Sequence, residues 1–109
     1  MTLREKQSIF LKNIAKLILW SFENGYELTG QELFRTQEQQ DIYFKTGKSK
    51  VKYSKHQDKL AIDLNLFING KYVTDKESFK PLAEYWRSLH HRNISGSDWG
   101  WDFNHFQAF

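Results

Sequence analysis

Apolar residues in the first quarter of the chain recur at helical spacing. The recurring positions are Ile9 or Phe10, Ile14, Leu17, Ile18 and Phe22. Because they fall three or four residues apart, they predict an amphipathic helix over residues 7–23, ended by Gly25. Its polar face is basic, which suits either solvent or a membrane surface, and we expect solvent.

A second pattern, the alternation of apolar and polar residues, covers residues 61–67 and predicts a strand. Its inward positions are Ile62, Leu64 and Leu66, and its outward positions are Ala61, Asp63 and Asn65. Asp63 is therefore expected on the open face of a half-buried strand. Asn69 and Gly70 then form a typical two-residue hairpin turn into a strand at residues 71–73.

Helix and turn signals place the other elements. A short extended segment is expected at residues 26–28. Thr36 and Gln39 form a capping box, which predicts a helix over residues 37–44 that stops near Gly47.

The last third of the chain contains a further helical pattern and a final strand. The helix is indicated by Phe79, Leu82, Trp86 and Leu89, with Pro81 in its first turn. Gly96 and Gly100 mark a loop, and residues 103–107 read as an extended segment. Helices and hairpin strands that do not alternate regularly predict an α+β fold, a small antiparallel sheet with flanking helices.

Length and composition favour one folded domain over residues 1–109, with little room for a separate second domain. Aromatic residues make up 17% of the chain, and large rings fill a small core efficiently. There is no cysteine, which excludes disulfides and cysteine-based zinc sites, so a zinc ion would need histidine and carboxylate ligands.

The charge and hydropathy patterns bear on partners and location. A net charge of +3 suits an anionic partner without identifying one. The longest apolar run near the start is residues 17–20, too short for a signal peptide or a membrane span. We therefore expect synthesis in the cytoplasm, no stable membrane insertion, and a monomer.

Six lysines occupy residues 45–59, and they are Lys45, Lys48, Lys50, Lys52, Lys55 and Lys59. The piece TGKSK hints at a phosphate-binding loop, but Ile42 stands where that motif needs a glycine. A solvated loop and a dedicated anion site remain open, and we expect the solvated loop.

Two separated stretches supply candidate metal ligands. His56, Asp63 and His105 could give three ligands of the kind that zinc hydrolases use, if a neighbouring strand brings His105 beside Asp63. His90 and His91 compete as ligands, but they follow a predicted helix end, where a histidine is favoured by the helix dipole. Asp102 lies three residues before His105, so a turn must intervene if both face one site.

The segments SKHQDKLAIDLNLF and WGWDFNHF together resemble the zinc peptidases of bacterial cell walls. That family includes D-Ala-D-Ala carboxypeptidases, vancomycin-resistance dipeptidases and phage L-alanyl-D-glutamate endopeptidases, which share a hedgehog/D-Ala-D-Ala peptidase-like fold. Its signature is Ser-x-His, six residues and Asp, then a carboxylate shortly before a final His. FRTQEQQDIYFKTGKS is also similar to the phage branch, so the resemblance spans about residues 26–107.

The resemblance implies the site chemistry. It makes His56, Asp63 and His105 the zinc ligands and places Asp102 as the catalytic carboxylate. Asp98 is the alternative base.

Four further positions follow from the same resemblance. Arg35 matches an arginine that steadies the substrate carbonyl, and Ser54 matches the serine near bound substrate. Gln39 matches a supporting glutamine. Lys59 departs from the pattern, because many relatives have glycine there.

The predicted function is therefore that of a zinc metallopeptidase that acts on peptidoglycan stem peptides, without a separate cell-wall-binding domain. The resemblance to the phage branch further implies a phage endolysin that cleaves the L-Ala-D-Glu bond. Such an enzyme would reach the wall through a phage holin. The alternatives are a D-Ala-D-Ala carboxypeptidase or dipeptidase, and a zinc-holding binding module without catalysis. A nucleic-acid-binding domain is not expected, because no recognised signature accompanies the lysines and aromatics.

Overall fold

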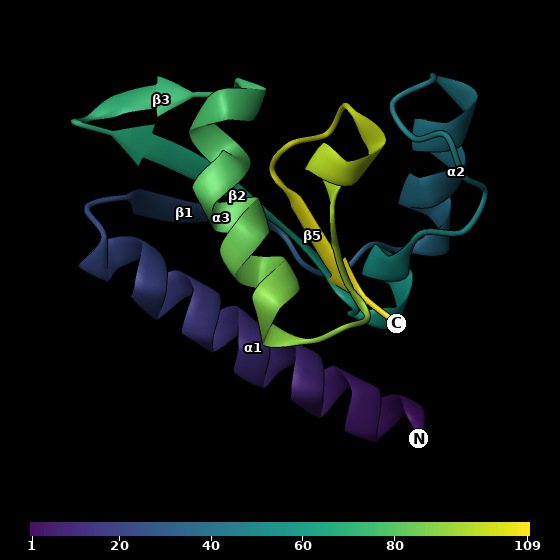
Figure 1. Ribbon diagram of the computed structural model, residues 1–109. Coiled ribbons are helices and arrows are strands. Elements are labelled where there is room, and N and C mark those ends of the chain that lie inside the picture. The colour runs from purple at the N-terminus through teal and green to yellow at the C-terminus, as the bar shows by residue number, and fades with distance from the viewer.

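The computed structural model describes all residues, 1–109 (Figure 1). It contains three α-helices, two 3₁₀-helices and five strands. Their order and bounds are α1 Leu3–Glu23, β1 Glu27–Glu32, α2 Gln37–Lys45, η1 Lys55–Asp58, β2 Ala61–Ile68, β3 Lys71–Val73, α3 Lys76–Leu89, β4 Asn93–Ser95, η2 Gly96–Trp99 and β5 His105–Ala108.

The five strands form one antiparallel sheet in the order β1-β2-β5-β4, and β3 pairs with the end of β2. The register between β2 and β5 pairs Ile62 with Phe106 and Asp63 with His105. Because neighbouring residues of a strand face opposite sides, the apolar pair, Ile62 and Phe106, points to one face of the sheet, and the polar pair, Asp63 and His105, points to the other. This register therefore separates a core face from a polar face.

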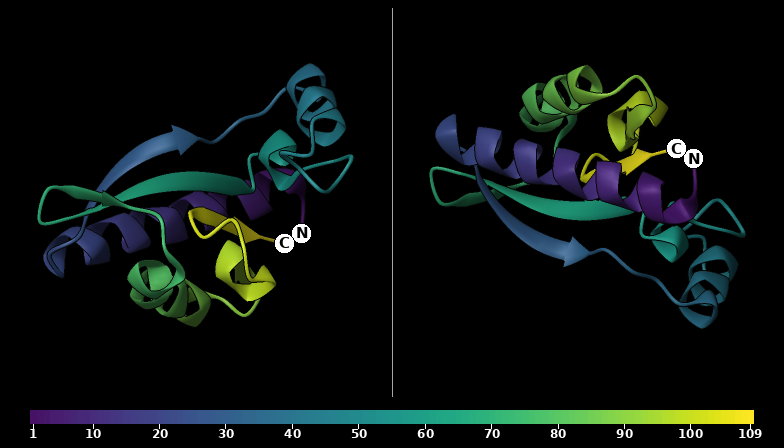
Figure 2. Two further views of the ribbon diagram at one scale, coloured as in Figure 1. Left: turned by 90° about the horizontal axis from the view of Figure 1, so that it is seen from above. Right: turned by 90° about the horizontal axis from the view of Figure 1, so that it is seen from below.

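One hydrophobic core joins α1, α3 and the core face of the sheet. Its sheet members include Leu64, Leu66 and Phe106, as the alternation in β2 predicts. Trp86 of α3 is fully buried and meets both Phe10 of α1 and Phe106 edge-on, with ring centroids 5.7 and 6.1 Å apart. Figure 2 shows α1 running alongside β2, while α2 stands apart from α1 and α3. The polar face is thus left for α2 and the loops.

The helix ends follow local capping. Thr36 caps α2 by accepting a hydrogen bond from the amide of Gln39, as predicted. The first helix begins at Leu3 rather than at residue 7, because Thr2 and Glu5 form a capping box ahead of the apolar pattern. No helix of the structure combines the length and the apolar character needed to cross a bilayer.

Three further details differ from the sequence predictions. Asp75 caps α3, so Pro81 lies in its second turn and not in its first. The extended segment after α1 is a six-residue strand, β1, that pairs with β2. The short strand β4 was not predicted, because three residues are too few to give a pattern; it exists through pairing with β5.

Candidate metal centre

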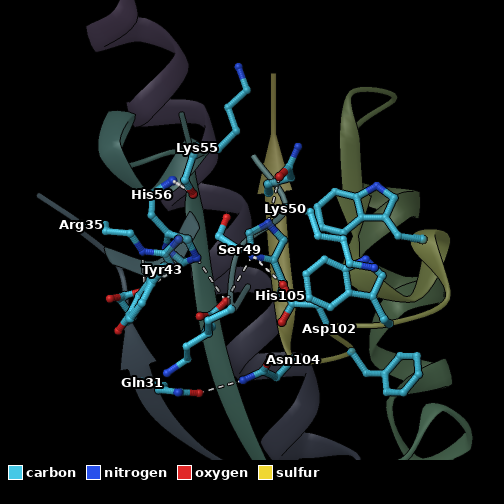
Figure 3. A pocket seen from close by; sticks show the side chains of 18 of the residues that line it. Gln31, Arg35, Tyr43, Ser49, Lys50, Lys55, His56, Asp102, Asn104 and His105 are labelled. Atoms are coloured by element: carbon cyan, nitrogen blue, oxygen red, sulfur yellow. Dashed lines mark hydrogen bonds and ion pairs between the residues drawn. The ribbon is translucent and has the colours of Figure 1, made fainter. Parts of the chain in front are cut away.

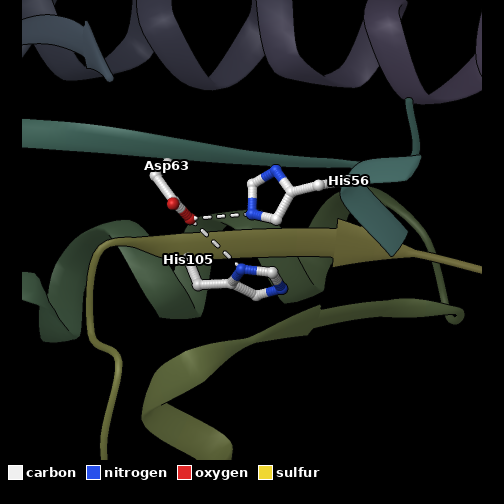
Figure 4. Close-up of side chains that lie close together, drawn as sticks. All are labelled: His56, Asp63 and His105. Atoms are coloured by element: carbon white, nitrogen blue, oxygen red, sulfur yellow. Dashed lines mark hydrogen bonds and ion pairs between the residues drawn. The ribbon is translucent and has the colours of Figure 1, made fainter. Parts of the chain in front are cut away.

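His56, Asp63 and His105 come together on the polar face of the sheet (Figure 4). Asp63 Oδ1 lies 3.2 Å from His56 Nε2 and 3.2 Å from His105 Nδ1. The candidate ligand atoms of the three residues all lie within 4.8 Å of one another, and all three residues are buried. Asp63 lies on the face opposite the core, as predicted, but it is only 9% exposed because it sits at the floor of the cleft described below. The three side chains could together hold one metal ion.

Hydrogen bonds outside the cluster orient the two imidazole rings. His56 Nδ1 lies 3.0 Å from the carbonyl of Leu33, and His105 Nε2 lies 2.8 Å from Gln107 Oε1. Since both partners accept, each of these nitrogens carries a proton, and the other nitrogen of each ring lies 3.2 Å from Asp63 Oδ1. His105 Nδ1 donates to that carboxylate when its ring is protonated. In the neutral rings, His56 Nε2 and His105 Nδ1 would offer lone pairs to a metal ion, with the supporting contacts behind them.

The donor set fits a zinc ion. His56 Nε2 is buried and makes no hydrogen bond of good geometry, although Asp63 Oδ1 lies 3.2 Å away, and such a polar atom is uncommon inside a protein. Two imidazole nitrogens and one carboxylate oxygen are typical ligands of catalytic zinc, which keeps a further position free. A metal ion would thus satisfy a buried nitrogen that the protein leaves without a well-formed hydrogen bond.

Without a metal ion, the charges of the cluster are strongly coupled. Burial acts to raise the pKa of Asp63, but the two histidines outweigh it and lower that pKa to about 2. Burial acts to lower the pKa of His105, but its hydrogen bond to Asp63 and the Asp63 charge raise that pKa above its ordinary value. Asp63 is therefore an anion at neutral pH, ready to neutralise a cation.

The Ser-x-His motif is explained by a cap. Ser54 is the N-cap of η1, and its hydroxyl accepts a hydrogen bond of 3.2 Å from the amide of His56. Gln57 completes the capping box by accepting from the amide of Ser54. Ser54 thereby fixes the turn that carries His56, and it also lines the cleft described below.

Lys59 ends this turn in the left-handed conformation, with φ of 57°. A side chain at such an angle costs roughly 1 kcal/mol relative to glycine. A glycine, which the resemblance predicts at this position, would adopt this backbone at lower cost, and η1 forms here despite the lysine.

Asp102 reaches the cluster through the expected turn. Its φ is 56°, and its carbonyl accepts a hydrogen bond of 3.1 Å from the amide of His105. Its Oδ2 lies 3.7 Å from His105 Nδ1. Burial raises the pKa of Asp102, although the nearby histidines and Arg35 oppose the rise. Asp98, the alternative base, instead accepts a hydrogen bond of 2.7 Å from Arg87, and it does not line the cleft.

Arg35 is tied to His56 through the backbone. Its amide donates to the carbonyl of His56 over 3.2 Å. Its guanidinium donates to Glu32 through two nitrogens and to Gln40 Oε1 over 2.8 Å, and it lies 4.8 Å from the ring centre of Tyr43. The side chain is 9% exposed, so it is held in one place at the edge of the cluster.

Three site residues were missed by sequence reasoning. The helix glutamine that contacts Arg35 is the fully buried Gln40, the residue after Gln39. The available signal was helical spacing, since Gln40 and Tyr43 lie three apart and share a face. Trp99 and Trp101 line the cleft, and the Trp99 ring centre lies 5.1 Å from that of His105.

An open cleft of about 820 Å³ surrounds the cluster on the polar face (Figure 3). The loop after α2, including residues 48–51, lines one part of it, and residues 72–74 line another. Asn104 and Gln31 join two of its walls through a hydrogen bond of 2.8 Å. His90 and His91 do not line the cleft, so they do not compete as ligands there; their rings stack on each other after α3.

Comparison with known proteins identifies the fold. No family model matches the chain, and no curated protein sequence matches it. The solved structure of the Serratia marcescens L-Ala D-Glu endopeptidase ChiX is similar, with 19% identity over 92% of this chain and 77% of that chain and a TM-score of 0.76. The vancomycin-resistance D,D-pentapeptidase VanY in complex with Zn(II) matches 91% of this chain and 70% of its own at 19% identity, with a TM-score of 0.56. The chain therefore has the α+β fold of these two peptidases, which confirms the predicted fold class.

Proposed function

We propose that this protein is a zinc metallopeptidase that cleaves peptidoglycan stem peptides at the L-Ala-D-Glu bond. The observation that carries the proposal is the convergence of His56, Asp63 and His105 on one point, with Asp102 Oδ2 3.7 Å from a ligand atom. A buried donor set of this kind at the floor of an open cleft suits metal-assisted hydrolysis of a peptide.

In the proposed mechanism, His56 Nε2, an Asp63 oxygen and His105 Nδ1 would hold the zinc ion. When bound, zinc supplies Lewis acidity that activates water and polarises a carbonyl group. Leu33 and Gln107 keep the two rings in the tautomers that ligation requires. Ser54 positions His56 by capping its turn.

Asp102 is the proposed general base. It accepts a proton from the attacking water and passes it to the leaving amine, which must depart neutral. The raised pKa of Asp102 makes its carboxylate a stronger base than an exposed aspartate. Its backbone is left-handed, and its Oδ2 lies 3.7 Å from His105 Nδ1, on the same face as the proposed ligands.

Arg35 is the proposed electrostatic partner of the carbonyl oxygen. A guanidinium has five N–H groups, and three hydrogen bonds to Glu32 and Gln40 leave two for a substrate. Because these contacts hold the side chain before substrate arrives, little reorganisation is needed as negative charge develops.

Two observations favour an internal bond over a terminal one. The cleft has lining residues beyond the metal cluster both in the loop after α2 and in the β3 region, which leaves room for substrate on either side. The TM-score to the L-Ala D-Glu endopeptidase is 0.76, against 0.56 to the D,D-pentapeptidase. A D-Ala-D-Ala carboxypeptidase or dipeptidase is the alternative. We further propose a phage endolysin role and release through a holin, on the similarity of residues 34–49 to the phage branch.

The test is digestion of purified peptidoglycan followed by mass spectrometry of the released fragments. Zinc-loaded protein should expose new N-terminal D-Glu, and chelation should stop the reaction until zinc is restored. His56→Ala should lose both zinc and activity, while His91→Ala, which removes an exposed histidine outside the cleft, should keep both. Release of D-Ala alone would replace the endopeptidase by a carboxypeptidase, and zinc binding without hydrolysis would indicate the non-catalytic module.

A further inference from the structure

The loop that joins α2 to η1 is held firmly against α2. Gln40 Nε2 donates to Ser49 Oγ over 3.0 Å and to the carbonyl of Val51 over 2.5 Å. The amide of Ser49 also donates to the carbonyl of Tyr43 over 2.9 Å. These bonds fix the backbone on which Lys48 and Lys50, the two neighbours of Ser49, stand in the wall of the cleft.

Both lysines lie against aromatic rings that border the metal cluster. Lys48 Nζ is 4.7 Å from the ring centre of Tyr43, and the guanidinium of Arg35 lies 4.8 Å from the same ring centre. Lys50 Nζ is 4.5 Å from the ring centre of Trp101, the residue before Asp102. Cation–π contacts of this length attract and orient an ammonium group. The two charges are thus placed beside the proposed electrostatic partner and beside the proposed base.

Neither ammonium group has a partner of opposite charge. No carboxylate lies within 4.0 Å of any lysine of the chain. Of the acidic residues that line the cleft, Glu32 pairs with Arg35, and Asp63 and Asp102 both face His105. The rim formed by Lys48 and Lys50 therefore presents positive charge that nothing in the protein neutralises.

We propose that Lys48 and Lys50 form a subsite for a free carboxylate of the substrate, close to the scissile bond. This inference rests on the proposed function. In a stem peptide, D-Glu is joined onward through its side chain, so its own α-carboxylate stays free beside the L-Ala-D-Glu bond. Amidation of that group removes the charge, so the subsite selects unamidated stem peptides.

The test compares two synthetic peptides that differ only in this group, L-Ala-γ-D-Glu-L-Lys and its D-isoglutamine counterpart. The wild-type protein should prefer the carboxylate form by about tenfold in kcat/KM. Each lysine would form one exposed ion pair with the carboxylate, each pair should raise kcat/KM roughly threefold, and the two factors multiply. Lys48→Gln with Lys50→Gln should bring the ratio close to one. Lys52→Gln is the matched control, because Lys52 is on the same loop and lies against Phe44 outside the cleft; its ratio should equal that of the wild type.

Binding of both peptides to zinc-loaded Asp102→Asn protein, measured by calorimetry, separates this inference from the proposed function. Cleavage of both peptides at equal rates, or a ratio that survives in the double variant, would overturn the subsite and leave the peptidase standing. If neither peptide is cleaved, the proposed function fails. The subsite would still be supported in that case if the carboxylate form binds more tightly and if this preference is lost when both lysines are replaced. Equal binding of the two forms would overturn it.

Discussion

Gly96 lies directly against the backbone of Asp102. A Cβ built on Gly96 would sit 1.8 Å from the carbonyl oxygen of Asp102 and 2.7 Å from its carbonyl carbon. That carbonyl accepts the hydrogen bond from the amide of His105, so η2 and the turn that carries the proposed base fit together only because residue 96 has no side chain.

Gly96→Ala should therefore displace the turn at residues 100–104. The carbonyl of Asp102 is backbone and cannot swing aside, so the turn has to move by more than 1 Å to reach an ordinary contact distance. Misplacement on that scale costs about a hundredfold in rate. Activity on peptidoglycan and zinc content are the measurements. Gly30→Ala is the matched control, because a Cβ there meets nothing within 4 Å; equal activity of the two variants would contradict the prediction.

The stability of the zinc-free protein should have an unusual dependence on pH. The pKa of His105 is raised in the folded protein, so its contribution is present below the unfolded value of about 6.5 and is lost as the pH rises through the folded pKa. The pKa of Asp63 is lowered to about 2, so its contribution is present above about 4 and is lost as the pH falls through 2. Chelated protein should therefore be most stable between about pH 4 and 6.5.

Urea unfolding of the chelated protein at pH 5, 6.5 and 8 measures this dependence. The free energy of unfolding should fall toward pH 8, and zinc should restore it there, since ligation needs the deprotonated ring of His105. Asp63→Asn should remove most of the dependence. A wild-type profile that rises from pH 5 to pH 8 without metal would be inconsistent with the ion pair.

Gln40 should matter for turnover more than for zinc binding. Gln40→Met keeps a similar volume but removes one hydrogen bond from Arg35 and two from the loop that follows α2. We expect about a tenfold loss of kcat, because a less firmly held Arg35 stabilises developing charge less well. Zinc content should be unchanged. Gln39→Met, one residue away on the same helix, is the control and should keep wild-type kcat.

Asp102→Asn should separate metal binding from catalysis. The amide cannot accept the proton of the attacking water, so turnover should fall by a factor of about 10² to 10⁴ while zinc stays bound. Asp98→Asn is the comparison, because Asp98 pairs with Arg87 outside the cleft and should lose little activity. Near-normal turnover by Asp102→Asn would assign the base to another group.

Arg35→Lys tests whether a charge alone is sufficient at this position. Lysine keeps the charge but loses the planar fork that donates to Glu32 and Gln40 at once. We expect a sharp fall in kcat with full zinc content, measured on the same peptidoglycan substrate. Wild-type kinetics in this variant would refute a specific role for the guanidinium.

The sequence by itself determined the parts of the fold that depend on neighbouring residues. The cap of Thr36 on α2, the alternation in β2 and the turn at Asn69 and Gly70 each involve residues at most a few positions apart, and the structure confirms them. Hydrophobic spacing likewise found the cores of α1 and α3, because an amphipathic helix must bury its apolar side. The spacing of His56, Asp63 and His105 pointed to a metal site through the family resemblance.

Only the tertiary structure decided how distant residues meet. His105 is 42 positions from Asp63, and the pairing of β5 with β2 aligns them. The strand β4 and the hydrogen bond from the Arg35 amide to the backbone of His56 also depend on contacts between distant residues. Gln40 is a further case, because its two contacts are with a loop that folds back on α2. These features depend on strand register and loop packing, which sum many weak contacts between remote segments, and no short pattern in the chain records that sum.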